Sequence, residues 1–169
     1  MEATPRAARL RHIQLCSGLL LRDDTVLLVR CRYDGEPEPL WTLPGGRQER
    51  EETIAETAAR EFLEETSLAI VIRELAYVSE SFDEGRGLHV INCTFFVDER
   101  DSNAPARSAD PKVVEARFVP RAQAAELLEA DVLRIPVAAA LSGQLQRRYF
   151  AFRDADVRIP FFQRQRIRA

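Results

Sequence analysis

Hydrophobic and polar residues alternate along several short stretches of the chain, which is the pattern of β-strands with one buried face. Ile13–Leu21 and Val26–Arg32 both show this pattern, and the polar turn Arg22–Thr25 separates them. Strands are expected, in the same way, at Trp41–Leu43, Leu68–Ser79, Leu88–Val97, Val113–Val119 and Tyr149–Phe152. The chain is therefore rich in strands along most of its length.

The clearest helical pattern covers Thr53 to Thr66, where apolar residues recur at spacings of three and four and form one stripe. The stripe consists of Ile54, Ala55, Ala58, Ala59, Phe62 and Leu63. Pro120 is expected to open a second helix, and a third is expected from Pro136 to about Arg147. Mixed strands and helices in this order predict an α/β fold.

Two polar segments read as loops. Tyr33 to Leu40 holds two prolines and a glycine, and Asp98 to Pro111 is a long stretch without a regular pattern. A structureless loop of that length inside a compact domain often has a function.

The chain has 169 residues, which is the length of one domain with its own core. The prediction is a single domain over residues 1–169, with a core at about 10–153 and a basic tail at 154–169. A net charge of −3 argues against a strongly basic nucleic-acid binder, so no nucleic-acid partner is expected.

Neither the cysteines nor the apolar runs point outside the cytoplasm. Three scattered cysteines, Cys16, Cys31 and Cys93, form no CxxC pair and no disulfide framework, and each is expected to be a core thiol. Apolar runs such as Leu68–Ile72 fall far short of the roughly 18 residues of a membrane helix. The polar residues Arg22–Asp24 argue against a signal peptide. A cytoplasmic protein without a membrane partner is expected.

The helix at Thr53–Thr66 has an arrangement of acids that costs free energy. Glu61 lies three residues before Glu64 and four before Glu65, so the carboxylates are neighbours on one face, where like charges repel. Two of them also lie in the last turn, where the helix dipole disfavours negative charge. A divalent cation would reverse both penalties, whereas the simpler alternative is a solvated face with Arg60 paired to Glu64. The glycine pair Gly45–Gly46 just before the helix allows close approach of backbone to a ligand.

The residues around this helix resemble the motif of one enzyme family. The matching positions are Gly46, Glu52, Arg60, Glu61, Phe62, Glu64, Glu65 and Leu68. Their spacing is similar to the Nudix box, in which G and E are followed by REUxEExGU, with U aliphatic or aromatic. The residues Trp41–Gly46 also look like the usual lead-in of that family. The one departure is Ser67, which stands where the family has glycine.

The resemblance implies a Nudix-type α/β/α sandwich with a mixed β-sheet between helices. It also implies a metal-dependent pyrophosphohydrolase that cleaves a nucleoside diphosphate linked to another moiety X by attack of water on phosphorus. Mg²⁺ or Mn²⁺ would be held by Glu61, Glu64 and Glu65 with the backbone carbonyl of Gly46. Arg60 would orient a glutamate, and Glu52 would brace the loop or hold a water.

Several roles stay open. The catalytic residues are predicted among Glu61, Glu64, Arg60 and Glu52, and the general base among Glu61 or Glu65 in the box and four acids outside it, Glu80, Glu84, Glu99 and Glu115. Phosphate binding is predicted for Arg30, Arg32 and Arg86, and base stacking for Tyr33, Trp41 or Phe82. For each of these the simpler interpretation is a solvated arginine or a packed aromatic ring.

Ser67 stands at the expected end of the helix. If the helix ends at Thr66, residue 67 takes the left-handed conformation, which costs serine about 1 kcal/mol. Because no carboxylate is lost, this departure bears on the helix end more than on activity. It is the only support for an alternative function, a Nudix-fold nucleotide-binding or sensor module with little or no turnover; another reaction on the same fold, such as isomerisation, also stays open. A homodimer is a further expectation.

Charge is concentrated in the box. Between Gly46 and Glu65 there are seven acids and three arginines, whereas the rest of the chain is close to neutral. The acidic balance of the whole protein therefore lies in one loop and one helix, where a cation would neutralise it.

Overall fold

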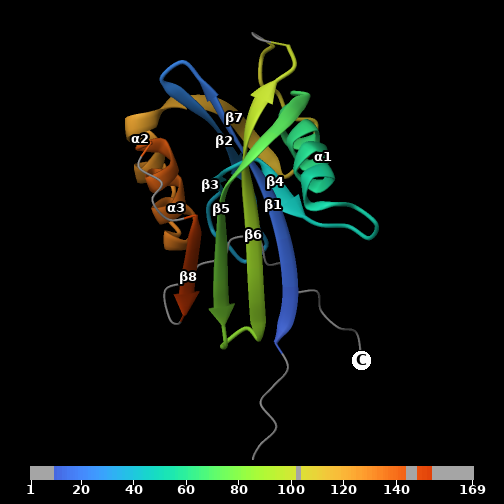
Figure 1. The fold of residues 1–169 in the computed structure, drawn as a ribbon, viewed down its shortest axis with the longest axis vertical. Helices are drawn as coiled ribbons and strands as arrows, with labels where there is room; N and C mark the ends of the chain where they lie inside the picture. Colours follow the sequence, from blue (N-terminus) through green and yellow to red (C-terminus); the bar gives the residue numbers. More distant parts are fainter. Residues whose placement is uncertain (1–9, 102–103, 144–147, 154–169) are drawn as a thin grey trace, which may run out of the picture.

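The computed structural model describes residues 10–101, 104–143 and 148–153. Eight strands and three helices follow one another along this part of the chain (Figure 1). The strands are β1 (Arg11–Arg22), β2 (Thr25–Cys31), β3 (Leu40–Thr42), β4 (Gly45–Arg47), β5 (Ile70–Asp83), β6 (Leu88–Glu99), β7 (Val113–Pro120) and β8 (Tyr149–Arg153). The helices are α1 (Ile54–Thr66), α2 (Arg121–Leu127) and α3 (Asp131–Leu141).

The strands form a mixed sheet in the order β3-β2-β1-β6-β5-β8, with β4 paired to β1 and β7 paired to β2. β1 runs parallel to β6 and β5 runs parallel to β8, whereas β5 and β6 form an antiparallel hairpin. Figure 1 shows α1 on one side of the strands and α2 and α3 on the other. The predicted α/β/α sandwich with a mixed sheet is confirmed.

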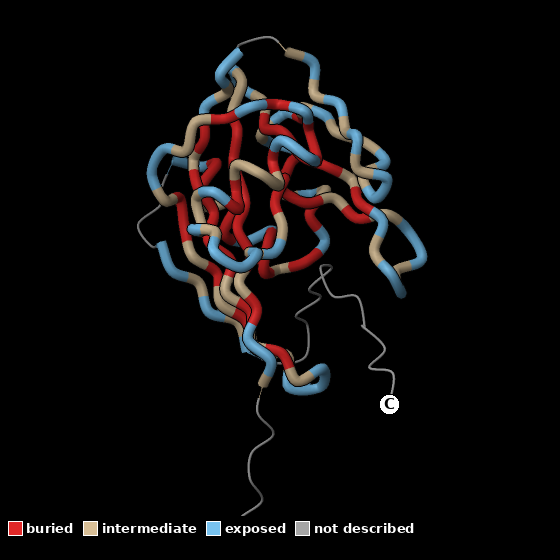
Figure 2. Tube along the Cα trace, turned by 90° about the vertical axis from the view of Figure 1, so that its right-hand side faces the viewer, coloured by how far each residue is buried: buried red, intermediate tan, exposed pale blue. Residues whose placement is uncertain are grey.

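Two apolar cores fill the spaces between the sheet and the helices, and the buried residues run along the strands (Figure 2). The core beneath α1 contains Phe62, which is fully buried together with Leu20 and Leu27. A Cβ atom on Gly18 would lie 2.6 Å from the Phe62 ring, so a glycine in β1 lets α1 pack close to the sheet. The core beneath α2 and α3 contains Leu19, Tyr77, Val137 and their neighbours.

Two predicted boundaries were wrong, and one strand was not predicted. The last helix spans Asp131–Leu141 instead of starting at Pro136, and the proline lies inside it. β5 continues to Asp83, beyond the predicted end at Ser79, because it pairs with β6 along its whole length. β4 was not predicted, since its three residues have no apolar pattern and become a strand only through pairing with β1.

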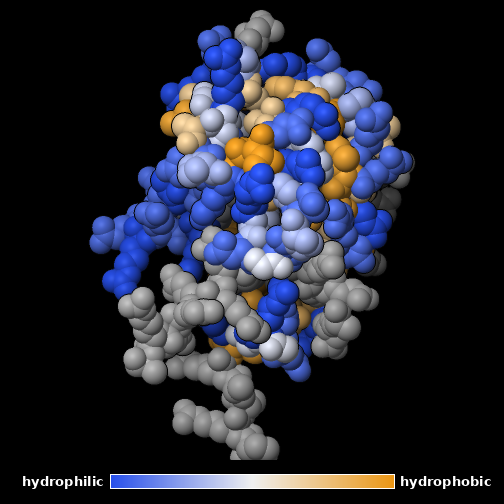
Figure 3. Space-filling view, turned by 180° about the vertical axis from the view of Figure 1, so that it is seen from behind, coloured by the Kyte–Doolittle hydropathy of each residue, from blue (hydrophilic) through white to orange (hydrophobic). Residues whose placement is uncertain are grey.

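Other predictions from the sequence are confirmed or lie outside the described part. Cys16, Cys31 and Cys93 are buried free thiols, as expected. No helix among the described residues is both long and apolar enough to cross a membrane. The predicted basic tail at 154–169 lies outside the described residues. Seen from behind, the described surface is mostly hydrophilic, with small separate hydrophobic areas (Figure 3).

Candidate active site

The ends of α1 are fixed by hydrogen bonds within its own sequence. At the start, the Thr53 hydroxyl accepts from the Glu56 N–H at 3.2 Å, and the Glu56 carboxylate accepts from the Thr53 N–H at 2.8 Å. At the end, Ser67 adopts φ 59° and ψ 15°, and its N–H donates to the Leu63 carbonyl at 2.8 Å. The predicted left-handed conformation of Ser67 is confirmed, and serine ends the helix at the expected place.

The glycine pair before α1 lies against two of its glutamates. β4 pairs with β1 so that Gly46 lies opposite Cys16. A Cβ atom on Gly46 would be 2.4 Å from the carboxyl carbon of Glu61, so any side chain here would displace that carboxylate from its present position. The Gly45 N–H donates to Glu65 Oε2 at 2.9 Å. The loop backbone and the acidic face of the helix therefore form one compact site.

Arg60 connects the carboxylates of this site. Its guanidinium contacts Glu52 through Nε at 2.7 Å and through Nη2 at 3.0 Å, which is a bidentate pair. Nη1 donates to Glu61 at 2.8 Å and to Glu64 at 3.4 Å. Nη2 also donates to the backbone carbonyl of Arg47 at 3.2 Å. The Arg60 guanidinium thus fixes the loop and the helix relative to each other.

Glu52 is held from several sides although it lies in a loop. Besides Arg60, it accepts hydrogen bonds from the Thr57 hydroxyl at 2.9 Å and from the Glu49 N–H at 3.2 Å. These donors, the Arg60 guanidinium first, lower the pKa of Glu52 to about 2. The geometry agrees with the predicted role of bracing the loop.

Glu65 is buried and Glu61 is half-buried. Burial raises the pKa of Glu61 above its ordinary range, although Arg60 opposes the rise. Burial also raises the pKa of Glu65 to about 8, because its hydrogen bond from Gly45 offsets only part of the loss of solvation. Glu64, by contrast, has a side chain that is 53 % exposed. For both Glu61 and Glu65, the loss of solvation therefore outweighs the stabilisation that Arg60 and the Gly45 N–H give to the ionised form.

A divalent cation needs several oxygen ligands that converge on one position. As the side chains stand, no group of three or more His, Cys, Asp or Glu residues in the described ranges converges on a metal position. Glu61 and Glu64 are turned toward Arg60, and Glu65 is turned toward Gly45. The donor chemistry nevertheless fits a hard cation, because buried carboxylates and a glycine without a Cβ face each other at this site.

Asp110 lies in the segment before β7, and its charge affects the carboxylates of this site. The sequence alone did not single it out. The segment before it is attached to the end of α1, because the Arg107 N–H donates to the Thr66 carbonyl at 2.9 Å. The Asp110 carboxylate accepts from the Lys112 N–H at 2.8 Å, and its charge helps to raise the pKa of both Glu61 and Glu65. Its sequence signals are its place in the long loop from Asp98 to Pro111, for which a function is expected, and an Asp-Pro pair before a strand, which is typical of any turn.

The three arginines predicted for phosphate binding do not form one cluster. Arg30 donates to the Pro39 carbonyl at 3.2 Å, and Arg32 is exposed just beyond the end of β2. Arg86 lies in the turn between β5 and β6, near Asp83. That turn is at the far end of the sheet from α1 (Figure 1). The structure thus separates Arg86 from the acidic site, and its predicted role in substrate binding loses its geometric support.

Three of the four acids outside the box that are candidates for the general base pair with a basic residue of their own. Glu99 pairs with Arg22 at 2.6 Å, and Glu80 pairs with His89 at 2.5 Å. Glu115 lies 3.4 Å from Arg117. Glu84 belongs to the distant turn between β5 and β6. None of these three ion pairs involves a residue between Gly46 and Leu68.

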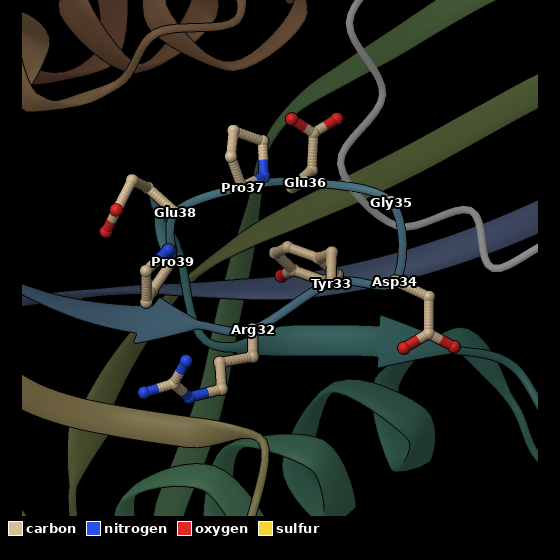
Figure 4. Close-up of a pocket in the computed structure, with 8 residues that line it drawn as sticks. All are labelled: Arg32, Tyr33, Asp34, Gly35, Glu36, Pro37, Glu38 and Pro39. Atoms are coloured by element: carbon tan, nitrogen blue, oxygen red, sulfur yellow. The ribbon is translucent and has the colours of Figure 1, made fainter.

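A cavity of about 320 Å³ lies in the loop between β2 and β3, lined by residues 32–39 (Figure 4). Figure 4 shows the Tyr33 ring inside the curve of this loop and the Glu38 carboxylate outside it. Burial raises the pKa of Tyr33 well above its ordinary range, with further contributions from Cys31 and Glu65. Of the predicted substrate residues, Arg32 and Tyr33 line this cavity.

Comparisons with known proteins agree on one family. The NUDIX domain profile matches residues 13–141. An ADP-ribose pyrophosphatase of Methanocaldococcus jannaschii is 35% identical over 81 residues, which are 48% of this chain and 47% of that protein. The matched part thus spans about half the length of this relative.

Solved structures have the same fold. A NUDIX hydrolase from Nitrosomonas europaea superposes with a TM-score of 0.68 at 20% identity, over 82% of this chain and 93% of the other. An ADP-ribose pyrophosphatase from Streptococcus suis superposes with a TM-score of 0.59 at 15% identity, over 84% and 98% of the two chains.

The fold and the site define an α/β protein whose glycine turn and acidic helix form one carboxylate-rich centre. The chain belongs to the NUDIX family.

Proposed function

We propose that the protein is a metal-dependent pyrophosphohydrolase that cleaves a nucleoside diphosphate linked to a second moiety. The observation that carries this proposal is the position of buried Glu65 and half-buried Glu61 beside Gly45 and Gly46, with Arg60 holding the loop to the helix. Buried acids without enough counter-charge are costly in a purely structural role, so a cationic ligand explains them.

Mg²⁺ or Mn²⁺ is the proposed cofactor, held by Glu61, Glu64 and Glu65 with the carbonyl of Gly46. When bound, such a cation would neutralise charge on the phosphate oxygens and ease deprotonation of the attacking water. Arg60 and Glu52 act on this site by positioning, because their bidentate pair fixes the loop that carries Gly46. Rotation of Glu61 and Glu64 away from Arg60 would complete the ligand set.

The reaction is the attack of water on phosphorus with cleavage of a phosphoric anhydride bond. A carboxylate of the site accepts the proton of the water, and the proposed candidates are Glu61, Glu65 and Asp110. The Asp110 charge reaches both glutamates. Catalysis then depends on in-line positioning and on charge stabilisation more than on covalent chemistry by the protein.

ADP-ribose is the first substrate to test. The relative named ADP-ribose pyrophosphatase is 35% identical over 81 residues, which supports a nucleoside diphosphate sugar as the substrate class. A homodimer and a cytoplasmic location stay predictions. The alternative of a binding or sensor module loses its one support, because Ser67 ends α1 with the expected hydrogen bond and displaces no glutamate.

The proposal is tested with a panel of ADP-ribose, nucleotide sugars, dinucleotide polyphosphates and nucleoside triphosphates, each with Mg²⁺ or Mn²⁺. Wild type is compared with Glu64→Gln, Glu65→Gln and the control Glu126→Gln, which lies exposed on α2. We expect release of phosphorylated products that is lost with chelator and with either box variant but not with the control. Tight nucleotide binding without turnover across the whole panel would instead favour the binding module.

A further inference from the structure

The ends of β1 and β6 carry a paired arginine and glutamate. The two strands run parallel, and the last residues that pair between them are Leu20 and Val97. Arg22 and Glu99 each lie two residues further along, so the strand register places them side by side. Arg22 donates to both carboxylate oxygens of Glu99, through Nε at 3.0 Å and through Nη2 at 2.6 Å. We call these two residues the strand-end pair.

The strand-end pair is well packed for two charged residues. The side chain of Glu99 is 10% exposed and that of Arg22 is 27% exposed. The guanidinium carbon of Arg22 also lies 4.0 Å from the centre of the Phe118 ring in β7, which is a cation–π contact. An ion pair with bidentate geometry and little solvent around it is held more firmly than an exposed pair. The strand-end pair can therefore fix a neighbouring segment of the chain.

The segment that the strand-end pair holds is residues 104–112, which leads into β7. Nη2 of Arg22 donates a further hydrogen bond to the Ala104 carbonyl at 3.1 Å. Ala104 is partly buried and packs against the core beneath α1. Three residues further along, the Arg107 N–H donates to the carbonyl of Thr66, the last residue of α1, at 2.9 Å. The segment is thus attached first to the strand-end pair and then to the end of α1.

The same segment ends beside the carboxylates of the candidate active site. The Asp110 carboxylate accepts from the Lys112 N–H at 2.8 Å, and the Lys112 carbonyl accepts from the Arg32 N–H at 2.8 Å. Burial is the main cause of the raised pKa of Glu61 and Glu65, and the charge of Asp110 adds to it. Asp110 therefore lies close enough to act on both glutamates.

Another ion pair at the same end of the sheet has no such connection. Arg73 of β5 contacts Asp98 of β6 at 2.5 Å, but their side chains are 55% and 59% exposed. Within the described part of the chain, neither side chain forms a hydrogen bond with segment 104–112. The Arg73–Asp98 pair is therefore a matched control for the strand-end pair.

We propose that the strand-end pair positions the catalytic site of the proposed hydrolase. It fixes segment 104–112 across the end of α1 and so holds Asp110 beside the carboxylates of the site. Both oxygens of Glu99 are bound to Arg22, so Glu99 acts through the segment and not as a general base. The inference rests on the proposed function, because it assigns the two residues to the same site. It also gives a role to the long loop at 98–111, for which the sequence predicts a function.

The first measurement is amide hydrogen exchange in the full chain, which needs no turnover. Arg22→Lys keeps the charge, but an ammonium group cannot bond both oxygens of Glu99 and the Ala104 carbonyl in one orientation. We expect the Arg107 N–H of this variant to exchange about tenfold faster than in wild type. Arg73→Lys is the control and should leave that exchange unchanged. Unchanged exchange in Arg22→Lys overturns the proposal.

The second measurement is a cycle of hydrolysis rates with the best substrate of the panel. Arg22→Lys should lower kcat about tenfold and leave KM within about twofold, because the segment acts on the reaction more than on binding. Asp110→Asn should lower kcat further than Arg22→Lys does. In a chain that carries Asp110→Asn, Arg22→Lys should have no additional effect on kcat, because the residue through which it acts is already lost. The same fold-change in both backgrounds is the result of a general loss of stability and overturns the proposal.

Glu99→Gln is the second variant for both measurements if Arg22→Lys does not fold, and the same directions are expected. The outcomes separate this inference from the proposed function. If wild type hydrolyses no compound of the panel, the proposed function fails and the positioning role falls with it. If wild type is active and the variants of the strand-end pair keep its kcat, the proposed function stands and the positioning role is overturned, whatever their rate of exchange.

Discussion

Arg60 holds Glu52 through two of its nitrogens, Nε at 2.7 Å and Nη2 at 3.0 Å, while its third nitrogen contacts Glu61. This fork joins the loop after β4 to the middle of α1. The geometry is specific to a planar guanidinium, because an ammonium group cannot reach both carboxylate oxygens and Glu61 in one orientation. The relationship explains how a loop and a helix keep the fixed spacing that the candidate site needs.

Replacement of Arg60 by lysine should therefore damage activity despite keeping the charge. We expect kcat to fall by about 10–100-fold, which is typical when a residue that orients a ligand is lost. The measurement is steady-state hydrolysis of the best substrate of the panel. Arg73→Lys is the matched control, because Arg73 forms an exposed pair with Asp98. Equal activity of the Arg60→Lys variant and wild type would show that the fork has no role in positioning.

Gly46→Ala should lower the rate of hydrolysis and leave the melting temperature almost unchanged. The new Cβ would lie 2.4 Å from the Glu61 carboxyl carbon, so the carboxylate must move. A displacement of about 1 Å at a catalytic group can cost about 100-fold in rate, and we expect a loss of that order with little change in melting temperature. Gly85→Ala is the control, because the nearest atom to its Cβ is a side-chain oxygen at 3.5 Å. Full activity of Gly46→Ala would place the reaction away from Glu61.

Ser67→Gly should stabilise the protein without changing its rate. Ser67 holds φ at 59°, where a residue with a Cβ is strained by about 1 kcal/mol. Relief of that strain raises the melting temperature of a domain of this size by about 2–4 °C. Calorimetry measures the shift, and Ser142→Gly is the control, because Ser142 ends α3 in the right-handed conformation. A lower melting temperature for Ser67→Gly would contradict the strain at this helix end.

The low pKa of Glu52 predicts a specific loss of stability in acid. Hydrogen bonds from Arg60, Thr57 and Glu49 hold this pKa at about 2, below the ordinary 4.5. The stabilisation from ionised Glu52 is therefore complete above pH 4.5 and is lost as the pH falls from 4.5 toward 2. The melting temperature of wild type should exceed that of Glu52→Gln near neutral pH, and the difference should shrink through this window. A difference that is constant from neutral pH to pH 2 would show that Glu52 is not held as an anion.

The sequence predicted those parts of the fold and the site that depend on local pattern. The helix at 53–66 is predicted within one residue, because its apolar stripe and its end before Ser67 are local signals. The boundaries of α3 were missed because a proline usually opens a helix, whereas Pro136 lies inside this one.

The parts that could not be predicted depend on contacts between distant segments. β4 has no apolar alternation and exists as a strand because Gly45–Arg47 pairs with β1. Asp110 reaches the site only because the segment that precedes it is attached to the end of α1. The separation of Arg86 from α1 depends on the length of the β5–β6 hairpin, which extends farther than its apolar pattern indicated.

The most direct measurement of the proposed function is the hydrolysis of ADP-ribose with Mg²⁺ by wild type, Glu65→Gln and Glu126→Gln under identical conditions. We predict formation of AMP and ribose 5-phosphate by wild type and by Glu126→Gln, and loss of at least about 100-fold in rate for Glu65→Gln. Chelation of the metal should abolish the reaction of all three proteins. Hydrolysis that is unchanged by Glu65→Gln and by the chelator would contradict a metal-dependent reaction at this site.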